Sequence, residues 1–512
     1  MLRRSLVAVV AFAGLLNAQG RGAAPARPAV PPAVALAAIT EADMKRDMFA
    51  LGGDNFRGRE AGTLDELRAS MWIADQARAI GLQPAGDDGS YFQWWSMRRT
   101  RVSDASRVIV GADTLVLWKD VIVLTPTTAV VNNQPIVWVG SAVGAELAAM
   151  DIRGKVVAAE LIAPPAAANV TPQNQNPLGT AAVNQRRDTL IAHGAAAIIF
   201  VGGPQFDDAY LRRLPTGVRG TYQVDSTRAG NVPIGGGRGR GNAVLQVPQV
   251  WISREKSALV RAPGAQATLS IAVASFTYPS VNIVAKVPGT DRAKRDEIIL
   301  FSGHQDHDGV RYDVNGDSIW NGADDNASVA VAMLGIGRAV VKRPMARTAL
   351  FVWHGAEERG LLGSRWFSRH PTVKKENIVA VLNADMIGRN HPDSAALLGV
   401  HPPHLNSNAV VAAAYAANQM TAKFVIDTSW DNPQHREGWY FRSDHLPYAQ
   451  ANIPAIMFST LLHADYHTPR DNPENIDIVK LTKMTKWMYA TGWILGNAAQ
   501  RPDLVPGFKL ER

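Results

Sequence analysis

The stretch "TALFVWHGAEERG", residues 348 to 360, joins a short apolar run to two adjacent glutamates, Glu357 and Glu358. A continuous apolar run of this length is typical of a strand that is buried on both faces of a parallel sheet. Neighbouring side chains on an extended backbone point in different directions, so the two carboxylates are expected to face different targets. In open α/β sheets, ligands bind beyond the carboxyl ends of the strands. The stretch therefore predicts a parallel sheet with a functional site at its edge.

Similar apolar runs recur through residues 277 to 500, where they alternate with helical patterns. This alternation predicts an α/β domain with a mostly parallel central sheet covered by helices on both faces. Residues 40 to 101 contain two amphipathic helical patterns, and we assign them to the same domain. The expected strands include "SVNIVAKV", "EIILFSG", "IVAVLNAD" and "AIMFS".

Residues 102 to 276 consist instead of short β-rich runs that are separated by Pro, Asn and Gly clusters. Such a pattern predicts an inserted β-rich module, a small sandwich or barrel with one or two helices. Residues 19 to 39 are rich in Ala and Pro and are predicted to be a linker. Residues 501 to 512 are expected to form a tail.

Composition restricts the class of protein. The chain has 512 residues and a formal net charge of +8, but acidic and basic residues are interspersed, which argues against a nucleic-acid partner. The first 18 residues carry two arginines, an apolar stretch and a small residue at Ala18, and they predict a signal peptide and an exported, periplasmic or extracellular protein. No cysteine is present, which excludes a disulfide scaffold. No later stretch approaches the length of a membrane span.

Five consecutive returns of the chain to one edge of the predicted sheet each bring a His, Asp or Glu. Lys and Arg are largely absent from these turns, so a solvated rim explains them poorly. Asp306 lies two residues after His304 and can hydrogen-bond the imidazole, which would fix its tautomer. The candidates are His304, Asp306, Asp325, Glu357, Glu358, Asp385 and His467.

Four carboxylates at one site, those of Asp325, Glu357, Glu358 and Asp385, would repel one another unless cations were present. Two divalent ions would offset this repulsion. Nitrogen and oxygen ligands without thiolate suit Zn²⁺, with Mn²⁺ or Co²⁺ as possible substitutes. The adjacent glutamates then have separate roles, because one holds a metal ion while its neighbour handles the proton of the attacking water.

Taken in order, the motifs resemble those of the co-catalytic di-zinc exopeptidases, a family that includes secreted bacterial aminopeptidases and glutamate carboxypeptidase, with transferrin receptor and glutaminyl cyclase as relatives. The resemblance spans about residues 278 to 500, and "DNFRGREAGT" (54 to 63) is similar to the amino-terminal segment of that family. The inserted module is similar to a protease-associated (PA) domain. The five motifs are "SGHQDHDG", "NGADDNAS", "HGAEERGLLGS", "LNADMIG" and "DYHTPRDN".

The resemblance implies a role for each candidate. His304 and Asp385 would hold one zinc ion, Glu358 and His467 the other, and Asp325 would bridge them. Glu357 would be the general base and Asp306 would orient His304, which places both among the catalytic residues. Three nearby predictions complete the site: Asp444 and His445 line the substrate pocket, His307 and Asp308 are solvated loop residues, and His354 is structural.

The leading prediction is a zinc-dependent aminopeptidase that acts on peptides. A carboxypeptidase or dipeptidase of the same fold remains open, because Arg359, Arg389 and Arg442 lie near the motifs and could bind a terminal carboxylate. Glutaminyl cyclase works with a single zinc ion and does not keep all five ligands, and a receptor-like binding protein would have lost ligands or the base. The serine-hydrolase pattern GxSxG and the zincin pattern HExxH are both absent.

Overall fold

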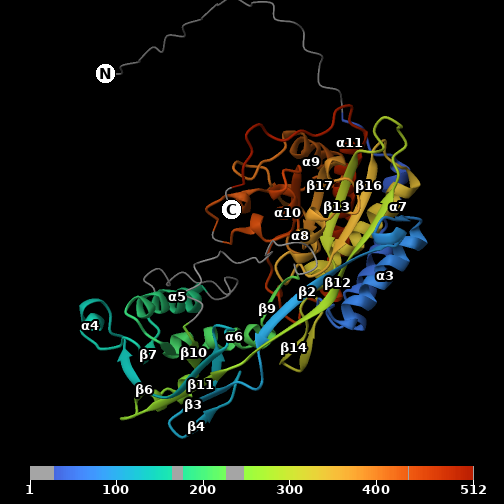
Figure 1. The fold of residues 1–512 in the computed structure, drawn as a ribbon. Coiled ribbons are helices and arrows are strands. Elements are labelled where there is room, and N and C mark those ends of the chain that lie inside the picture. Colours follow the sequence, from blue (N-terminus) through green and yellow to red (C-terminus); the bar gives the residue numbers. More distant parts are fainter. Residues whose placement is uncertain (1–27, 164–176, 226–246, 436, 511–512) are drawn as a thin grey trace, which may run out of the picture.

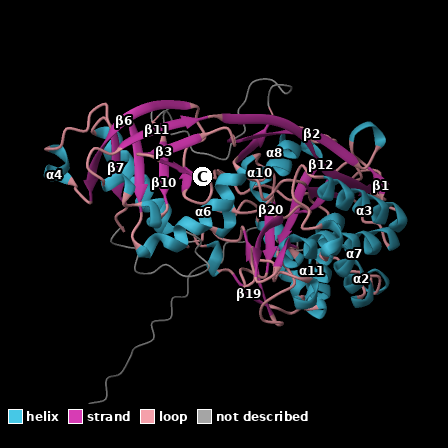
Figure 2. Ribbon diagram, turned by 90° about the horizontal axis from the view of Figure 1, so that it is seen from below, coloured by secondary structure: helices cyan, strands magenta, loops and turns pink. Residues whose placement is uncertain are grey.

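The structure is a computed structural model that describes residues 28–163, 177–225, 247–435 and 437–510. The predicted signal peptide and the start of the predicted linker lie outside the described residues. The chain forms two units, an α/β unit and a β-rich unit, and two long strands run from one to the other (Figures 1 and 2).

The α/β unit is built on a ten-stranded sheet whose four central strands are parallel. These are β16 (Thr348–His354), β13 (Ile298–His304), β17 (Ile378–Asp385) and β20 (Ala455–Ser459). The flanking strands are β18 (Ser394–Leu398) and β19 (Val425–Asp427) on one side and β12 (Val273–Val287), β2 (Phe92–Val102), β9 (Thr221–Val224) and β1 (Gln83–Pro84) on the other. The predicted parallel sheet is confirmed at the centre, while antiparallel pairing joins the flanking strands to it.

Helices cover both faces of this sheet, as predicted. Successive side chains of the central strands point to opposite faces, so each face packs against its own layer of helices. Ile299 and Phe301 pack against one layer of helices, and Ile298 and Leu300 pack against another. The first layer contains α2 (Glu41–Leu51), α3 (Leu64–Ile80), α7 (Ser328–Lys342), α9 (Asn408–Met420) and α11 (Ile478–Asn497), and the second contains α8 (Leu362–Arg369) and α10 (His445–Gln450). Among the described helices, none is both long and apolar enough to cross a bilayer.

The β-rich unit contains an eight-stranded sheet whose strands all lie between residues 107 and 271. Val108 and Leu269 from one half of the sheet share a buried cluster with Val156 and Ile199 from the other half, so the two halves pack against each other in the manner of a sandwich. In order across the sheet, the strands are β4 (Asp113–Leu115), β3 (Arg107–Val110), β11 (Gln266–Ile271), β6 (Ala129–Gly140), β7 (Val156–Glu160), β8 (Ala197–Val201), β10 (Gln249–Ile252) and β5 (Val121–Val123). Three helices accompany it among the described residues, one more than expected: α4 (Gly144–Ala148), α5 (Pro177–Ala192) and α6 (Asp207–Arg219).

The predicted linker is wrong for its last residues. A short helix, α1 (Ala33–Leu36), packs on α7, and Ala35 and Ile39 are buried in the main core. Pro32 is the N-cap of α1, and proline is tolerated at the start of a helix, where it costs no internal hydrogen bond. The small alanine side chains then allow a close approach to the core.

The amino-terminal motif contributes Arg59, which is fully buried between the loops that carry the metal-ligand candidates. Its Nε donates to the carbonyl of Gln305 at 2.7 Å, and its terminal nitrogens donate to the carbonyls of Leu51 (2.9 Å), Asn321 (2.8 Å) and Gly322 (2.8 Å). Burial lowers the pKa of Arg59 to about 10, so the guanidinium keeps its charge at neutral pH. The side chain therefore joins the loop after β13 to the loop before α7.

We expect Arg59→Met to lower the free energy of unfolding by at least about 3 kcal/mol, because four buried carbonyls lose a charged donor and each unsatisfied acceptor costs about 1–3 kcal/mol. Urea denaturation measures the change. Arg57→Met is the matched control, since the Arg57 side chain in the same turn is 57% exposed. Equal stability of the two variants would remove Arg59 from this bridging role.

Candidate metal centre

The predicted ligands gather at the carboxyl edge of the central strands. His304 ends β13 and Asp385 ends β17, while Glu357 and Glu358 follow the end of β16. Asp325 lies in a short helical segment, η7 (Ala323–Ala327), that leads into α7. His467 comes from the loop after β20. The position expected for ligands in an open α/β sheet is the one observed.

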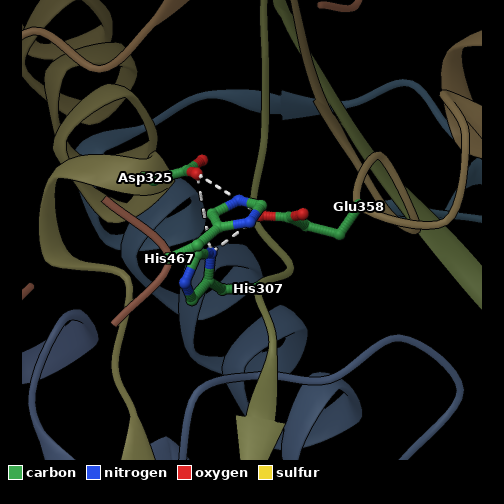
Figure 3. A group of neighbouring side chains, drawn as sticks. All are labelled: His307, Asp325, Glu358 and His467. Atoms are coloured by element: carbon green, nitrogen blue, oxygen red, sulfur yellow. Dashed lines mark ion pairs between the residues drawn. The ribbon is translucent and has the colours of Figure 1, made fainter. Parts of the chain in front are cut away.

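Two groups of His and carboxylate side chains form there, and in each group the candidate ligand atoms lie within 4.8 Å of one another. The first group contains His304, Glu357 and Asp385, and the second contains His307, Asp325, Glu358 and His467. Figure 3 shows the four side chains of the second group pointing toward one another.

The carboxylate of Asp325 faces both groups. Its Oδ1 lies 3.4 Å from Nε2 of His304, and its Oδ2 lies 3.0 Å from Nε2 of His467. The two oxygens of one carboxylate thus face the two groups, which is the geometry of a bridging ligand.

The two adjacent glutamates diverge. Oε2 of Glu357 lies 3.8 Å from Nε2 of His304, whereas Oε1 of Glu358 lies 3.2 Å from Nε2 of His467. Burial and the neighbouring carboxylates raise the pKa of Glu357 well above its usual value. Burial also raises the pKa of Glu358, but the imidazoles of His467 and His307 outweigh it and hold the pKa well below its usual value. Two neighbours in sequence therefore have opposite electrostatic surroundings.

Asp306 does not orient His304 in the way the sequence suggested. Nδ1 of His304 lies 3.1 Å from the backbone carbonyl oxygen of Asp306, while the Asp306 carboxylate is 3.8 Å from that nitrogen. The carboxylate accepts the backbone N–H groups of Glu357 (2.9 Å) and Glu358 (3.3 Å) instead. Asp306 thus fixes the turn that presents both glutamates, and its main chain fixes the histidine tautomer with Nε2 facing the carboxylates.

The prediction that His307 and Asp308 are solvated is wrong, because both side chains are fully buried. Nδ1 of His307 lies 2.8 Å from Oε1 of Glu358. Asp308 pairs with three arginines, and its Oδ2 lies 3.8 Å from Nδ1 of His467. The arginines are Arg311, Arg359 and, from α6 of the β-rich unit, Arg219. Arg219 and Arg359 are distant from Asp308 in the sequence and only Arg311 lies near it, so the local pattern held little signal of the burial.

His354 is structural, as predicted. It is buried outside both groups, and its Nε2 lies 3.1 Å from the hydroxyl of Tyr448. Burial lowers the pKa of His354 to about 3, so the ring is neutral.

Asp444 and His445, the predicted substrate-binding residues, are fully buried where α10 begins. Burial raises the pKa of Asp444 to about 7, and its carboxylate raises the pKa of Glu357 in turn. The ring of His445 lies 4.7 Å from that of Tyr440, and burial lowers its pKa to about 3. Asp444 is thus the one of the two whose charge reaches the first group.

Sequence reasoning missed Asp471, the second aspartate of the "DYHTPRDN" motif. Its buried carboxylate accepts the backbone N–H groups of Asp324 (3.0 Å) and Asp325 (3.1 Å). It therefore holds the segment that presents Asp325. The recurrence of an aspartate at the end of a motif that already supplies His467 was the available signal.

The side chains fit a bound cation. Nε2 of His304, Nε2 of His467 and Oε1 of Glu358 are buried and have no hydrogen-bond partner among the described residues. Burial lowers the pKa of His467, but Glu358 and Asp325 outweigh it and raise the pKa to about 9. Buried polar atoms are normally paired, so orphans that face one another indicate a missing positive partner. Imidazole and carboxylate without thiolate is a donor set that suits Zn²⁺.

Comparison with solved structures supports the fold class. The chain is similar to an aminopeptidase from Aneurinibacillus sp. strain AM-1, with a TM-score of 0.56, 19% identity, and coverage of 93% of this chain and 98% of that one. It is also similar to BSAP, a zinc aminopeptidase from Bacillus subtilis, with a TM-score of 0.55, 19% identity, and coverage of 92% and 99%. At these identities the likeness shows the fold.

Curated relatives are similar over part of the chain. Leucine aminopeptidase 1 of Trichophyton rubrum is 27% identical over 252 residues, which are 46% of this chain and 64% of the relative. Leucine aminopeptidase 1 of Arthroderma otae is 33% identical over 146 residues, 27% of this chain and 37% of the relative. The chain thus spans less than two thirds of the length of these relatives. Residues 282–491 match the model of Peptidase family M28, which confirms the family resemblance of the five motifs.

Proposed function

We propose that the protein is a zinc-dependent aminopeptidase. One observation carries the proposal: the Asp325 carboxylate of the second group also faces His304 of the first, and Glu357 of the first group has a side chain that is still 11% exposed. A water molecule and a peptide can therefore reach a carboxylate that stands next to both metal groups. The Peptidase family M28 match and the relatives named leucine aminopeptidase support this choice of reaction.

Two zinc ions fit the site. His304, Asp385 and Oδ1 of Asp325 would hold one ion, and Glu358, His467 and Oδ2 of Asp325 would hold the other. When bound, zinc at such a site acidifies a water molecule and polarises the carbonyl of the scissile bond.

Glu357 moves the proton. Its Oε2 takes a proton from the attacking water and later gives it to the nitrogen of the leaving peptide. Asp306 accepts the backbone N–H of Glu357 at 2.9 Å, so the main chain of the base is fixed beside the site.

The charges around the site favour an amino terminus over a carboxyl terminus as the substrate end. The three arginines that could bind a terminal carboxylate each pair with a carboxylate of the chain: Arg359 with Glu60, Arg389 with Asp465 and Arg442 with Glu437. The carboxyl of Asp444 lies close enough to Glu357 of the first group to influence its pKa. Asp444 would attract the ammonium group of the substrate, with His445 packed behind it.

The β-rich unit is PA-like in this proposal and helps to shape the site. Arg219 of this unit lies 3.2 Å from Asp308, whose other oxygen faces His467. The unit therefore contacts the candidate metal centre through an ion pair with a buried aspartate.

Export completes the proposal. Residues 1 to 18 have the charged start, apolar stretch and small residue of a signal peptide. Amino-terminal sequencing of protein secreted by its host would find a mature end near residue 19, and an end at Met1 would contradict export by cleavage.

A mixed peptide pool tests the activity directly. With Zn²⁺ added, we expect mass spectrometry to show stepwise shortening from free amino termini, and chelation should abolish it. Loss of residues from the carboxyl end would instead indicate a carboxypeptidase. An ammonia-sized mass loss from amino-terminal glutamine would indicate a cyclase, and an unchanged pool would contradict a peptidase.

Glu357→Gln should lower kcat/KM about a hundred- to ten-thousandfold while the zinc content stays at the wild-type level, because the amide cannot accept the proton. Hydrolysis of leucine p-nitroanilide and metal analysis measure the two quantities. Glu376→Gln, at an exposed glutamate, is the control. Near-wild-type turnover of Glu357→Gln would assign the base elsewhere.

His467→Ala should lower zinc occupancy, because its Nε2 faces both Asp325 and Glu358 at about ligand spacing. Metal content per chain after dialysis against a weak chelator is the measurement. His391→Ala, at an exposed histidine outside both groups, should keep the wild-type content. Full occupancy of the His467 variant would exclude this residue from the ligand set.

A further inference from the structure

We propose that His307 is a fourth protein ligand of the second metal ion, which makes that site closed while the first site stays open. This inference rests on the two-ion site of the proposed function and goes beyond it, because the five motifs imply no metal role for this histidine. Four side chains would then surround the second ion: His307, Asp325, Glu358 and His467.

The imidazole of His307 is held firmly in place. The backbone N–H of His307 donates to the carbonyl of Arg59 at 3.3 Å, and His307 forms an isolated β-bridge with Glu60. On the other side the ring lies against Gly322, where an added Cβ would overlap His307 Cγ. Gly322 also has a positive φ of 59°, which favours glycine. The chain therefore leaves a space next to the metal group that fits this ring.

Both ring nitrogens of His307 are buried and have no hydrogen-bond partner among the described residues. Nδ1 faces Oε1 of Glu358 at 2.8 Å and Oδ2 of Asp325 at 3.9 Å, and Oε1 of Glu358 is itself without a hydrogen-bond partner there. An N–H group aimed at Glu358 would satisfy both atoms, yet the pair does not have hydrogen-bond geometry. A lone pair on Nδ1 that is directed at a shared cation explains why both atoms are orphans.

The spacing of the ligand atoms agrees with this assignment. Zinc bonds to nitrogen and oxygen are about 2.0–2.1 Å long, so two ligand atoms of a tetrahedral site lie about 3.3 Å apart. The distances that His307 makes, 2.8 Å and 3.9 Å, lie on either side of this value, and the 3.0 Å and 3.2 Å distances of His467 lie just below it.

A closed second site would give the two ions different roles. Structural zinc sites have four protein ligands, whereas catalytic sites keep a position for water or substrate. The first group keeps such a position if Glu357 acts as the base, because only His304, Asp385 and Asp325 then bind the ion. The second ion should therefore bind more tightly than the first.

Zinc titration of the apoprotein against a competing chelator tests this assignment without any activity measurement. Wild-type protein should take up two ions in two steps, the tighter of which belongs to the second site. His307→Ala should weaken that step more than the roughly 10- to 100-fold that is typical of losing a residue that only supports a ligand. His445→Ala is the matched control, because His445 is equally buried with both ring nitrogens unpartnered among the described residues but lies outside both groups.

His307→Cys gives a second test that does not require the alanine variant to fold. The chain has no cysteine, so the introduced thiol would be unique. With Co²⁺ in place of zinc, a thiolate ligand produces a near-ultraviolet charge-transfer band that wild-type protein lacks, and we expect this band. Unchanged affinity for both ions in His307→Ala would overturn the assignment, and so would a missing band in folded His307→Cys.

These outcomes are separate from the fate of the proposed function. If wild-type protein binds two ions but does not shorten peptides, the activity is wrong while the ligand assignment stands. If it shortens peptides and His307→Ala still binds both ions normally, the ligand assignment is wrong while the activity stands.

Discussion

The structure depends on the repulsion between four carboxylates that meet at one sheet edge. Asp325, Glu357, Glu358 and Asp385 are buried or nearly so, and even a paired buried charge loses several kcal/mol of hydration. The imidazoles between them are neutral ligands when a metal is bound and cannot offset four negative charges. Divalent cations offset the four negative charges fully, so the stability of this edge of the sheet depends on cation binding.

The scaffold meets this constraint mainly through main-chain hydrogen bonds. Asp306 holds the turn with the two glutamates, Asp471 holds the segment with Asp325, and Arg59 joins the two loops from the amino-terminal segment. None of the three belongs to either His and carboxylate group, yet together they decide where the candidate ligands lie. Arg219 extends the same arrangement to the β-rich unit, because it pairs with a buried aspartate behind His467. Ligand geometry is thus set by residues that are far apart in the sequence.

Much of this arrangement could be predicted because the rules involved are local. Apolar runs fix the parallel strands, and their ends fix the sheet edge, which is why His304, Glu358 and His467 were expected together. The burial of His307 could not be predicted, because it depends on contacts with Arg59 and Gly322 that only the folded chain creates. The role of the Asp306 carboxylate was misjudged for a similar reason, since spacing along a strand cannot show that a distant turn offers better donors. The helix at Ala33–Leu36 was missed because a short alanine-rich segment carries almost no periodic signal.

A crystal structure of the zinc-loaded protein, with anomalous scattering measured at the zinc edge, tests the central claim most directly. Two peaks should lie about 3.5–4 Å apart on either side of the Asp325 carboxylate. One peak should contact His304 and Asp385, and the other should contact Glu358 and His467 together with Nδ1 of His307. A single peak, or two peaks without Asp325 between them, would contradict the view that paired cations hold this edge of the sheet together.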